Sequence, residues 1–249
     1  MTENLSEMNS NNPEFSVIIP AYNEEERIHN TLNKVIAYFE NFKKEYEIIV
    51  VDDGSKDNTS KVVEEFQTVK LIKQEKNTGK GAAVRKGMLE AKGKFRIFTD
   101  ADLSTPIYEF TKLYQKYQDG YDICIGSRAV DYSLIKVHQP FYREFMGKTF
   151  NKIVQLLLIK GIKDTQCGFK GFSDTAATKI FNNAKIDGFG FDVEIIYLAK
   201  KLNYRIIEIP VEWYNDERSK VNPIKDSIRM FKEILKIRKL HQNFKDEVE

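Results

Sequence analysis

Short apolar runs alternate with segments of helical periodicity along the first half of this chain, and this alternation is the strongest constraint on its fold. We expect strands at Phe15–Pro20, Tyr46–Val51, Val69–Ile72, Phe95–Thr99 and Tyr121–Ile125. We expect helices between them at Glu24–Phe42, Asn58–Phe66, Gly79–Ala91 and Pro106–Tyr117. Strands that alternate with helices favour a mostly parallel sheet covered by helices on both faces. The predicted fold class is therefore α/β.

The second half has longer helical segments and fewer strands. The expected helices are Phe141–Ile159, Ser173–Phe181, Phe191–Lys201 and Pro223–Leu240, and the expected strands are Phe169–Phe172 and Arg205–Val211. The last helix is basic and amphipathic, and its apolar side carries Ile224, Ile228, Phe231 and Leu235. We divide the chain into a polar, disordered lead-in at residues 1–14, a catalytic-type domain at 15–221, and the C-terminal helix with its tail at 222–249.

The composition limits the classes of function. The 249 residues are 41% hydrophobic and 31% charged, which is typical of a soluble globular protein. The net charge of +2 indicates no strong general affinity for nucleic acid. Cys124 and Cys167 match no zinc spacing, so we expect reduced thiols in a cytosolic protein. Because no stretch approaches the ~18–20 apolar residues of a membrane span, and no apolar signal core opens the chain, we expect neither a span nor secretion.

An acid pair follows the fourth expected strand. Asp100-Ala101-Asp102 comes directly after Phe95–Thr99. In open α/β sheets, ligands bind at the carboxyl ends of the strands. Two carboxylates at such a place suit a divalent cation such as Mg²⁺, whose remaining positions are filled by phosphates. The alternative for an isolated acid pair is a turn or a helix cap.

Three other loops follow strands on the same expected edge of the sheet. Pro20-Ala21-Tyr22-Asn23-Glu24 could stack on a base and bind its edge, or could form an ordinary capped helix start. Asp52-Asp53-Gly54-Ser55 suits a ribose or a base N–H, or a plain Asp-Gly turn. Asn77-Thr78-Gly79-Lys80-Gly81 could approach a phosphate, although it departs from the common phosphate-loop pattern. Together these loops predict a mononucleotide pocket.

In order and spacing, these four segments resemble the family 2 inverting glycosyltransferases with the GT-A fold, a Rossmann-like fold. Later segments resemble the polyprenyl-phosphate hexosyltransferases within that family: Gly126-Ser127-Arg128, Asp164–Lys170, Phe191-Asp192-Val193-Glu194 and Ser219-Lys220. The segments Asp100–Pro106 and Asp164–Lys170 are most similar to the dolichyl-phosphate β-glucosyltransferase group. The resemblance covers roughly residues 15 to 240.

The resemblance implies a role for each matching residue. The nucleotide would be held by Pro20, Tyr22, Glu24, Asp52, Asp53, Lys80, Asp100 and Ala101. Asp100 and Asp102 would hold Mg²⁺ or Mn²⁺ on the diphosphate. Arg128 and Arg143 would bind the phosphate of the acceptor, Asp164 would approach the reacting sugar, and Lys220 would close over the diphosphate. The chain departs from the group at Arg218, where those enzymes usually have glycine.

The implied reaction is transfer of glucose from UDP-glucose to dolichyl or another polyprenyl phosphate, with inversion to a β-linked product. A phosphate monoester is largely a dianion at neutral pH and needs little help from a base, so we expect Asp164 to orient groups rather than to accept a proton. Rival donors are GDP-mannose and other UDP-sugars. Rivals of another class are a non-catalytic sugar-nucleotide-binding partner protein and a membrane-surface scaffold.

A lipid acceptor implies contact with a membrane. The helices at Phe141–Ile159 and Pro223–Leu240 combine apolar and basic residues, as interfacial helices do. We therefore expect a peripheral protein at the cytoplasmic face of a membrane. The alternative is that these helices pack on the domain or on a second subunit, and the sequence leaves open a homodimer or a separate membrane-protein anchor.

Overall fold

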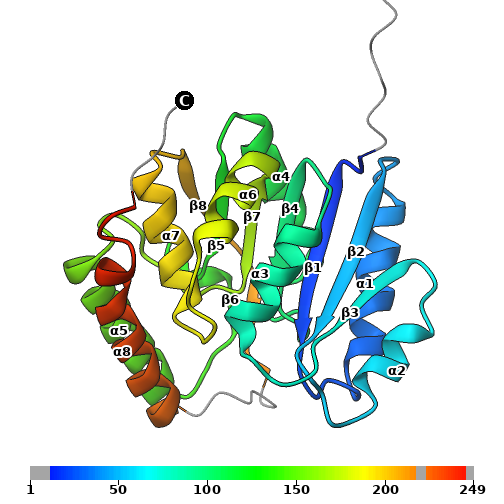
Figure 1. Ribbon diagram of the computed structural model, residues 1–249, viewed down its shortest axis with the longest axis horizontal. Coiled ribbons are helices and arrows are strands. Elements are labelled where there is room, and N and C mark those ends of the chain that lie inside the picture. The colour runs from blue at the N-terminus through cyan, green and yellow to red at the C-terminus, as the bar shows by residue number, and fades with distance from the viewer. Residues whose placement is uncertain (1–11, 217–222, 245–249) are drawn as a thin grey trace, which may run out of the picture.

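The computed structural model describes residues 12–216 and 223–244 of the chain. Within these ranges one seven-stranded sheet is covered by helices on both faces (Figure 1). Its strands are β1 Phe15–Ala21, β2 Tyr46–Asp52, β3 Val69–Lys73, β4 Phe95–Thr99, β5 Ile123–Ser127, β7 Phe169–Ser173 and β8 Ile206–Pro210. The helices are α1 Ile28–Glu40, α2 Thr59–Glu64, α3 Lys80–Glu90, α4 Phe110–Gln118, α5 Phe141–Leu157, α6 Asp174–Asn183, α7 Phe191–Lys201 and α8 Pro223–Leu240. The predicted α/β class is confirmed.

The strand order brings the expected loops to one edge of the sheet. The order is β3-β2-β1-β4-β7-β5-β8, and only β7 runs antiparallel to its neighbours. The loops that follow β1, β2, β4 and β5 therefore leave from the same edge, which is the ligand-binding edge of open α/β sheets. Because β7 is reversed, the loop that precedes it also lies there, and Phe169 pairs with Thr99.

The sheet separates two apolar clusters. Along β1, Ile18 belongs to one cluster, whereas Val17 and Ile19 belong to the other, as expected for side chains that alternate across a strand. The first cluster includes buried residues of α3, α6, α7 and α8, and the second includes those of α1 and α4. Apolar side chains therefore cover both faces of the sheet. This explains why its strands are continuous apolar runs and do not alternate between apolar and polar residues.

Two local features differ from the expectation. Helix α1 begins at Ile28 rather than Glu24, because Asn23 adopts a left-handed conformation (φ 55°) and its N–H donates to Ser55 Oγ at 2.8 Å. A small sheet joins β6 Ile135–Val137 to β9 Trp213–Tyr214, and neither strand was expected. Such short strands carry no periodicity of their own, since pairing between distant segments creates them.

Helix α8 forms as expected, and one face of it is buried. Met230, Ile234 and Ile237 pack inward at a helical spacing. Phe231 and Leu235, which we expected on the apolar side of this helix, lie outside the packed face and are exposed. The apolar surface of α8 is wider than the stripe that one neighbouring layer can cover, so part of it faces outward.

Some expectations lie outside the described residues. These are most of the lead-in at 1–14 and the segment with Arg218 and Lys220. The division into 15–221 and 222–249 stays a prediction, although Ile234 and Ile237 of α8 belong to the same apolar cluster as α7. Across the described part of the chain, every helix is too short or too polar to cross a bilayer.

The aromatic core beside β1 allows a test of the fold. The ring of Phe110 is fully buried, with its centroid 5.0 Å from that of Phe15 and 4.8 Å from that of Phe39. Phe110→Ala is expected to lower the free energy of unfolding by about 3–5 kcal/mol in urea titrations, because it leaves a cavity. The matched control Phe145→Ala removes an exposed ring and is expected to stay within about 0.5 kcal/mol of the wild type.

Candidate active site

The acid pair lies at the carboxyl end of β4 and faces the start of α3. Lys80 Nζ lies 2.5 Å from Asp100 Oδ1, and Asp102 Oδ1 accepts a hydrogen bond from Ser104 N at 2.8 Å. Burial raises the pKa of Asp102, and the charge of Asp100 raises it further. Burial lowers the pKa of Lys80, but Asp100 and the other acids around it outweigh burial, so the pKa is raised. The site therefore favours additional positive charge.

The loop before β7 fixes the acid pair from the other side. A Cβ at Gly168 would overlap the carboxylate of Asp100, so only glycine allows the backbone to approach this closely. The antiparallel pairing of β7 with β4 creates this contact, because it places Phe169 beside Thr99. The position of the Asp100 carboxylate thus depends on a segment far away in the sequence.

A cavity of about 380 Å³ opens on one side of the acid pair, between the loops that follow β1 and β2 and the start of α3. The expected nucleotide-binding residues that line it are Pro20, Ala101, Tyr22, Glu24, Asp53, Lys80 and Asp100. Arg27 and Arg229, which were not anticipated, line it as well. The size of this cavity, and the charged side chains in its wall, suit a nucleotide.

Asp52 and Asp53 have different surroundings. Asp53 accepts hydrogen bonds from Thr78 N and Gly79 N, both at 2.8 Å, and so holds the loop before α3. Asp52 accepts from Ser55 N at 2.9 Å, and it is absent from the cavity wall as far as the described residues go. A direct contact between Asp52 and a nucleoside stays a prediction, whereas Asp53 also shapes the loop that carries Lys80.

A second cavity of about 290 Å³ lies on the other side of the acid pair. Arg128, from the loop after β5, and Arg143, from α5, both line it. The buried Nε of Arg143 has no hydrogen-bond partner within residues 12–216 and 223–244. A buried guanidinium N–H without an acceptor favours an anionic ligand at this place.

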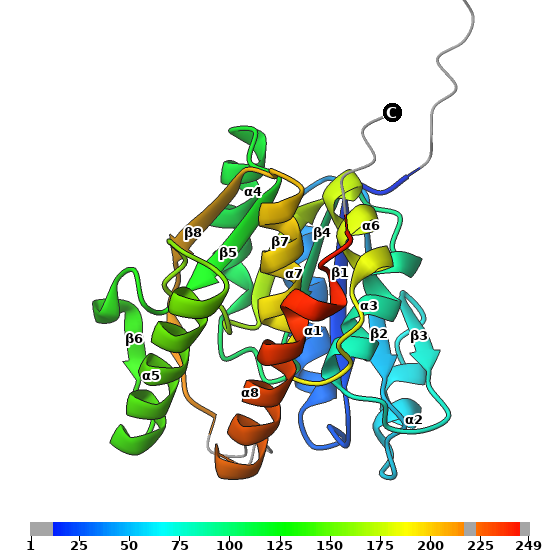
Figure 2. The same ribbon diagram turned by 60° about the vertical axis from the view of Figure 1, so that its left-hand side comes forward.

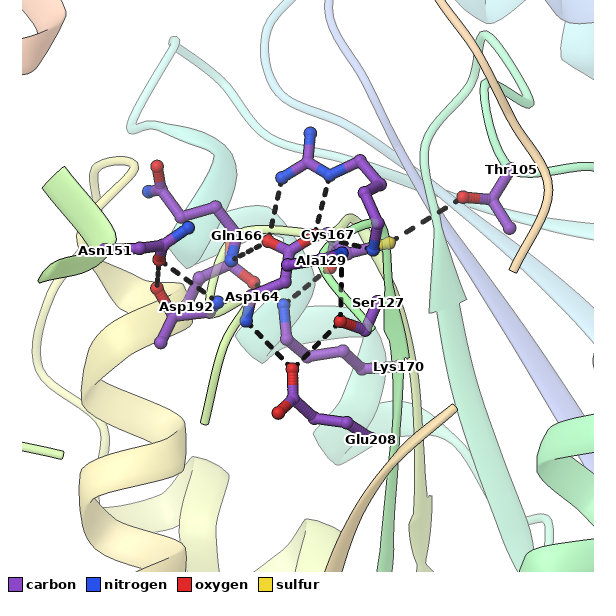
Figure 3. Close-up of polar contacts among 12 residues, drawn as sticks. Thr105, Ser127, Ala129, Asn151, Asp164, Gln166, Cys167, Lys170, Asp192 and Glu208 are labelled. Carbon is purple, nitrogen blue, oxygen red and sulfur yellow. Dashed lines mark hydrogen bonds and ion pairs between the residues drawn. The ribbon is translucent and has the colours of Figure 1, made fainter. Parts of the chain in front are cut away.

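Asp164, which Figure 3 labels, is buried and forms a bidentate ion pair with the partly buried Arg128. Arg128 donates from Nε at 2.7 Å and from Nη2 at 2.8 Å, and its backbone N donates at 3.0 Å. Gln166 N also donates to Asp164, at 3.2 Å. Burial alone would raise the pKa of Asp164, but Arg128 outweighs burial and lowers it to about 2. The lone pairs of Asp164 are thus occupied, which favours a positioning role over that of a base.

Sequence reasoning missed two aromatic residues of the site. The ring centroid of Trp213 lies 5.5 Å from the guanidinium carbon of Arg128, and Trp213 lines the second cavity. Phe189 lines both cavities. Its flanking glycines, Gly188 and Gly190, were the one sequence signal that could have indicated a tight turn beside a ligand. Lys220 lies outside the described residues.

A second ion pair, in which both side chains are buried, supports the wall of the site. Lys170, on β7, is fully buried and donates to the carboxylate of Asp192 and to Cys167 O, the latter at 2.6 Å. Burial raises the pKa of Asp192, although Lys170 opposes this effect. Asp192 lies in the first turn of α7 and lines the second cavity.

Comparison with known proteins places this geometry in a family. The family model described as "Glycosyl transferase family 2" matches residues 16–181, which contain the acid pair, Lys80, Arg128 and Asp164. The chain belongs to this family. The protein is therefore a glycosyltransferase, and the resemblance inferred from the sequence is confirmed.

Relatives in the family share most of their length with this glycosyltransferase. It is 41% identical to a dolichyl-phosphate beta-glucosyltransferase of Dictyostelium discoideum, over 90% of this chain and 73% of the relative. It is 36% identical to the human protein of the same name, over 90% of this chain and 75% of the human protein. It is also 36% identical to the protein of that name from Saccharomyces cerevisiae, over 94% of this chain and 77% of the yeast protein.

Solved structures confirm the fold of this glycosyltransferase. Glucosyl-3-phosphoglycerate synthase from Mycobacterium tuberculosis, crystallised with uridine diphosphate, superposes with a TM-score of 0.66 at 17% identity, over 92% of this chain and 79% of that one. The same synthase with Mn²⁺ and UDP-glucose gives a TM-score of 0.66 at 15% identity, over 91% and 79%. At this identity the likeness concerns the GT-A-type fold alone.

The Arg128–Asp164 pair predicts a pH dependence of stability. Because the folded pKa of Asp164, about 2, lies below the unfolded value of about 3.9, its stabilisation is complete at neutral pH and is lost as the pH falls through about 2. Asp164→Asn is expected to cost about 3–5 kcal/mol at pH 7, since it leaves Arg128 without its charge partner. Urea titrations should show the difference from the wild type shrinking below pH 4. A difference that is independent of pH would contradict this account.

Proposed function

We propose that this glycosyltransferase moves glucose from UDP-glucose to the phosphate of dolichyl or a related polyprenyl phosphate, with inversion at the anomeric carbon. One observation carries the proposal: a nucleotide-sized cavity and a cavity with two arginines meet at Asp100 and Asp102. A donor in the first and an acceptor phosphate in the second would therefore react at the acid pair. The names of the relatives support the sugar and the lipid, and the structural neighbour crystallised with UDP-glucose supports the class of donor.

The donor would lie across the first cavity. Tyr22 and Glu24 would contact the nucleoside, and Lys80, at the start of α3, would approach the diphosphate. The loop that Asp53 holds thus places the cation of Lys80 beside the leaving group.

The residues at the end of β4 fit a divalent cation. Asp100 and Asp102 supply two carboxylate groups, the usual protein share of a Mg²⁺ or Mn²⁺ site that phosphates complete. Burial, and then the charge of Asp100, raise the pKa of Asp102, so a cation bound between the two carboxylates would relieve their repulsion. When bound, such a metal would neutralise charge on the diphosphate oxygens.

The acceptor would bind as a phosphate dianion between Arg128 and Arg143. Its oxygen attacks the anomeric carbon, the bond from that carbon to the diphosphate oxygen breaks, and UDP leaves with the electron pair. No proton has to be removed from the acceptor, because the second pKa of a phosphate monoester is near ~6. This chemistry agrees with an Asp164 that is ionised, fully hydrogen-bonded and engaged in holding Arg128.

A donor panel tests the proposed reaction. Purified protein, a short polyprenyl phosphate and Mg²⁺ or Mn²⁺ are expected to give lipid-linked glucose from UDP-glucose, and less or no product from UDP-GlcNAc, UDP-galactose or GDP-mannose. Chelator and Asp102→Asn are each expected to lower the rate by at least about a hundredfold, because both leave the diphosphate charge unbalanced. Transfer from GDP-mannose instead would show that the transferred sugar is mannose and not glucose. Tight nucleotide binding without any transfer would support a non-catalytic partner.

Arg143 allows a separate test of the acceptor site. Arg143→Ala is expected to raise the KM for the lipid phosphate about tenfold or more, because it removes a charge-assisted hydrogen bond to the phosphate. The KM for UDP-glucose should change little, since Arg143 lines only the second of the two large cavities. Arg238→Ala, on the exposed end of α8, serves as the control. An equal rise in both KM values would contradict the assignment.

The first turns of α5 offer a surface for the membrane that would hold the acceptor. Phe141 is 84% exposed and Phe145 is 70% exposed, and the exposed Lys148 lies one turn further along. In Figure 2 the beginning of α5 lies at the lower side of the molecule, as do the carboxyl ends of the parallel strands. Exposed aromatic side chains beside lysines suit the interface of an anionic bilayer. The proposed location is the cytoplasmic face of a membrane, with peripheral attachment.

Vesicle sedimentation tests this surface. The wild type is expected to bind vesicles that contain phosphatidylserine more tightly than vesicles of phosphatidylcholine alone, and high salt should weaken the difference. Phe141→Ser with Phe145→Ser is expected to reduce binding about tenfold or more, because two apolar side chains no longer enter the bilayer. Leu89→Ser, which removes a less exposed apolar side chain from α3, is the control. Unchanged binding of the double variant would exclude this surface.

A further inference from the structure

Phe189 occupies the junction of the two cavities. Of the described residues, four line both cavities: Lys80, Asp100, Asp102 and Phe189. The first three are charged, and Phe189 is the apolar member of this set. If the diphosphate lies at the acid pair and the acceptor phosphate at the arginines, the transferred sugar must lie between them. The C–H face of a pyranose packs well on an aromatic ring, so Phe189 lies where such a contact would form.

The turn that carries Phe189 is fixed to the start of α3. Asp187 O accepts hydrogen bonds from Gly81 N at 2.8 Å and from Ala82 N at 3.2 Å. These are N–H groups of the first turn of α3, which lack partners within the helix. The turn therefore keeps a constant position relative to Lys80, which also belongs to that turn of α3.

Helix α8 holds the same turn from the opposite side. Glu233 Oε2 accepts a hydrogen bond from Gly190 N at 2.9 Å, and Glu233 Oε1 pairs with Arg229 at 3.2 Å. A Cβ at Gly188 would overlap the Glu233 carboxylate, and one at Gly190 would lie 2.7 Å from its Oε2. The backbone on both sides of Phe189 is thus pressed against one side chain of α8.

A second carboxylate holds the segment that leads into the turn. Glu194, on α7, is fully buried and accepts from Lys185 N at 3.0 Å and from Ile186 N at 2.8 Å. His241, just after α8, donates from Nε2 to Glu194 Oε1 at 2.7 Å. Helix α8 is therefore linked to the turn twice, directly through Glu233 and through His241 and Glu194.

We infer that Phe189 is a specificity-determining residue that packs against the transferred hexose, and that Glu233 is the positioning residue that holds it there. This inference rests on the proposed function, since it needs a sugar nucleotide in the first cavity. It assigns α8 a task in the reaction, namely to keep the aromatic side chain at the junction of the two cavities.

The test compares two ligands that differ only in the sugar. Binding of UDP and of UDP-glucose to the full-length protein is measured by titration calorimetry with Mn²⁺. Phe189→Ala is expected to weaken the binding of UDP-glucose about tenfold, because only the sugar would contact the ring. The affinity for UDP should stay within about twofold of the wild-type value. In the transfer assay the same variant should raise the KM for UDP-glucose, whereas the KM for the lipid phosphate should not change.

Variants of Glu233 separate positioning from simple loss of stability. Glu233→Ala removes the acceptor for Gly190 N. It is expected to weaken the binding of UDP-glucose more than that of UDP, and by a smaller factor than Phe189→Ala does. Glu233→Gln keeps an oxygen acceptor and is expected to restore most of the affinity. Lys236→Ala, on the exposed side of α8, is the matched control and should bind both ligands as the wild type does.

The outcomes separate a failure of the roles of Phe189 and Glu233 from a failure of the proposed function. Equal weakening of UDP and UDP-glucose by Phe189→Ala, or no weakening of either, would overturn the role of Phe189 and leave the proposed function intact. A Glu233→Gln variant as impaired as Glu233→Ala would overturn the positioning role. A wild type that binds neither UDP nor UDP-glucose would overturn the proposed function and the inference that rests on it.

Discussion

The antiparallel pairing of β7 with β4 is the constraint on which the rest of the site depends. It places Phe169 beside Thr99, and so brings the loop before β7 to the edge where the parallel strands end. In that loop Gly168 lies against the carboxylate of Asp100, and Asp164 holds Arg128. A parallel β7 would carry the loop to the opposite edge, and the acid pair would lose its support from that side.

Ion pairs stabilise the side chains that the pairing of β7 with β4 brings together. Asp164 is paired with Arg128 and Asp192 with Lys170. Both carboxylates are buried, and each pair is supported by further hydrogen bonds. Buried ions are tolerated only with such partners, because removing them from water is costly. Asp100 and Asp102 differ from these pairs, since Lys80 is a single cation opposite two carboxylates. The centre of the site thus combines neutralised charges in its walls with unbalanced negative charge at its middle, and the proposal of a metal and a diphosphate there rests on this distribution.

Local patterns predicted much of the site. The loops after β1, β2 and β4 follow strongly apolar runs, so the sequence pattern predicts Tyr22, Asp53 and the acid pair on one edge of a sheet. The contacts of Asp53 with Thr78 N and Gly79 N could not be predicted in this way, because they join loops that meet only once β2 and α3 are packed. The same holds for Trp213 beside Arg128, since β9 exists only through its pairing with β6.

The sequence by itself determined the α/β class, the direction of the first strands and the residues of the acid pair, because each depends on periodicity or on neighbours along the chain. Only the tertiary structure decided which face of α8 is buried, how Asp164 meets Arg128 and where Phe189 lies. Phe189 is held by Glu233, 44 positions further along the chain, and by the start of α3, more than a hundred positions earlier. The physical reason is that such contacts depend on how three separate elements pack, and no local pattern records that packing.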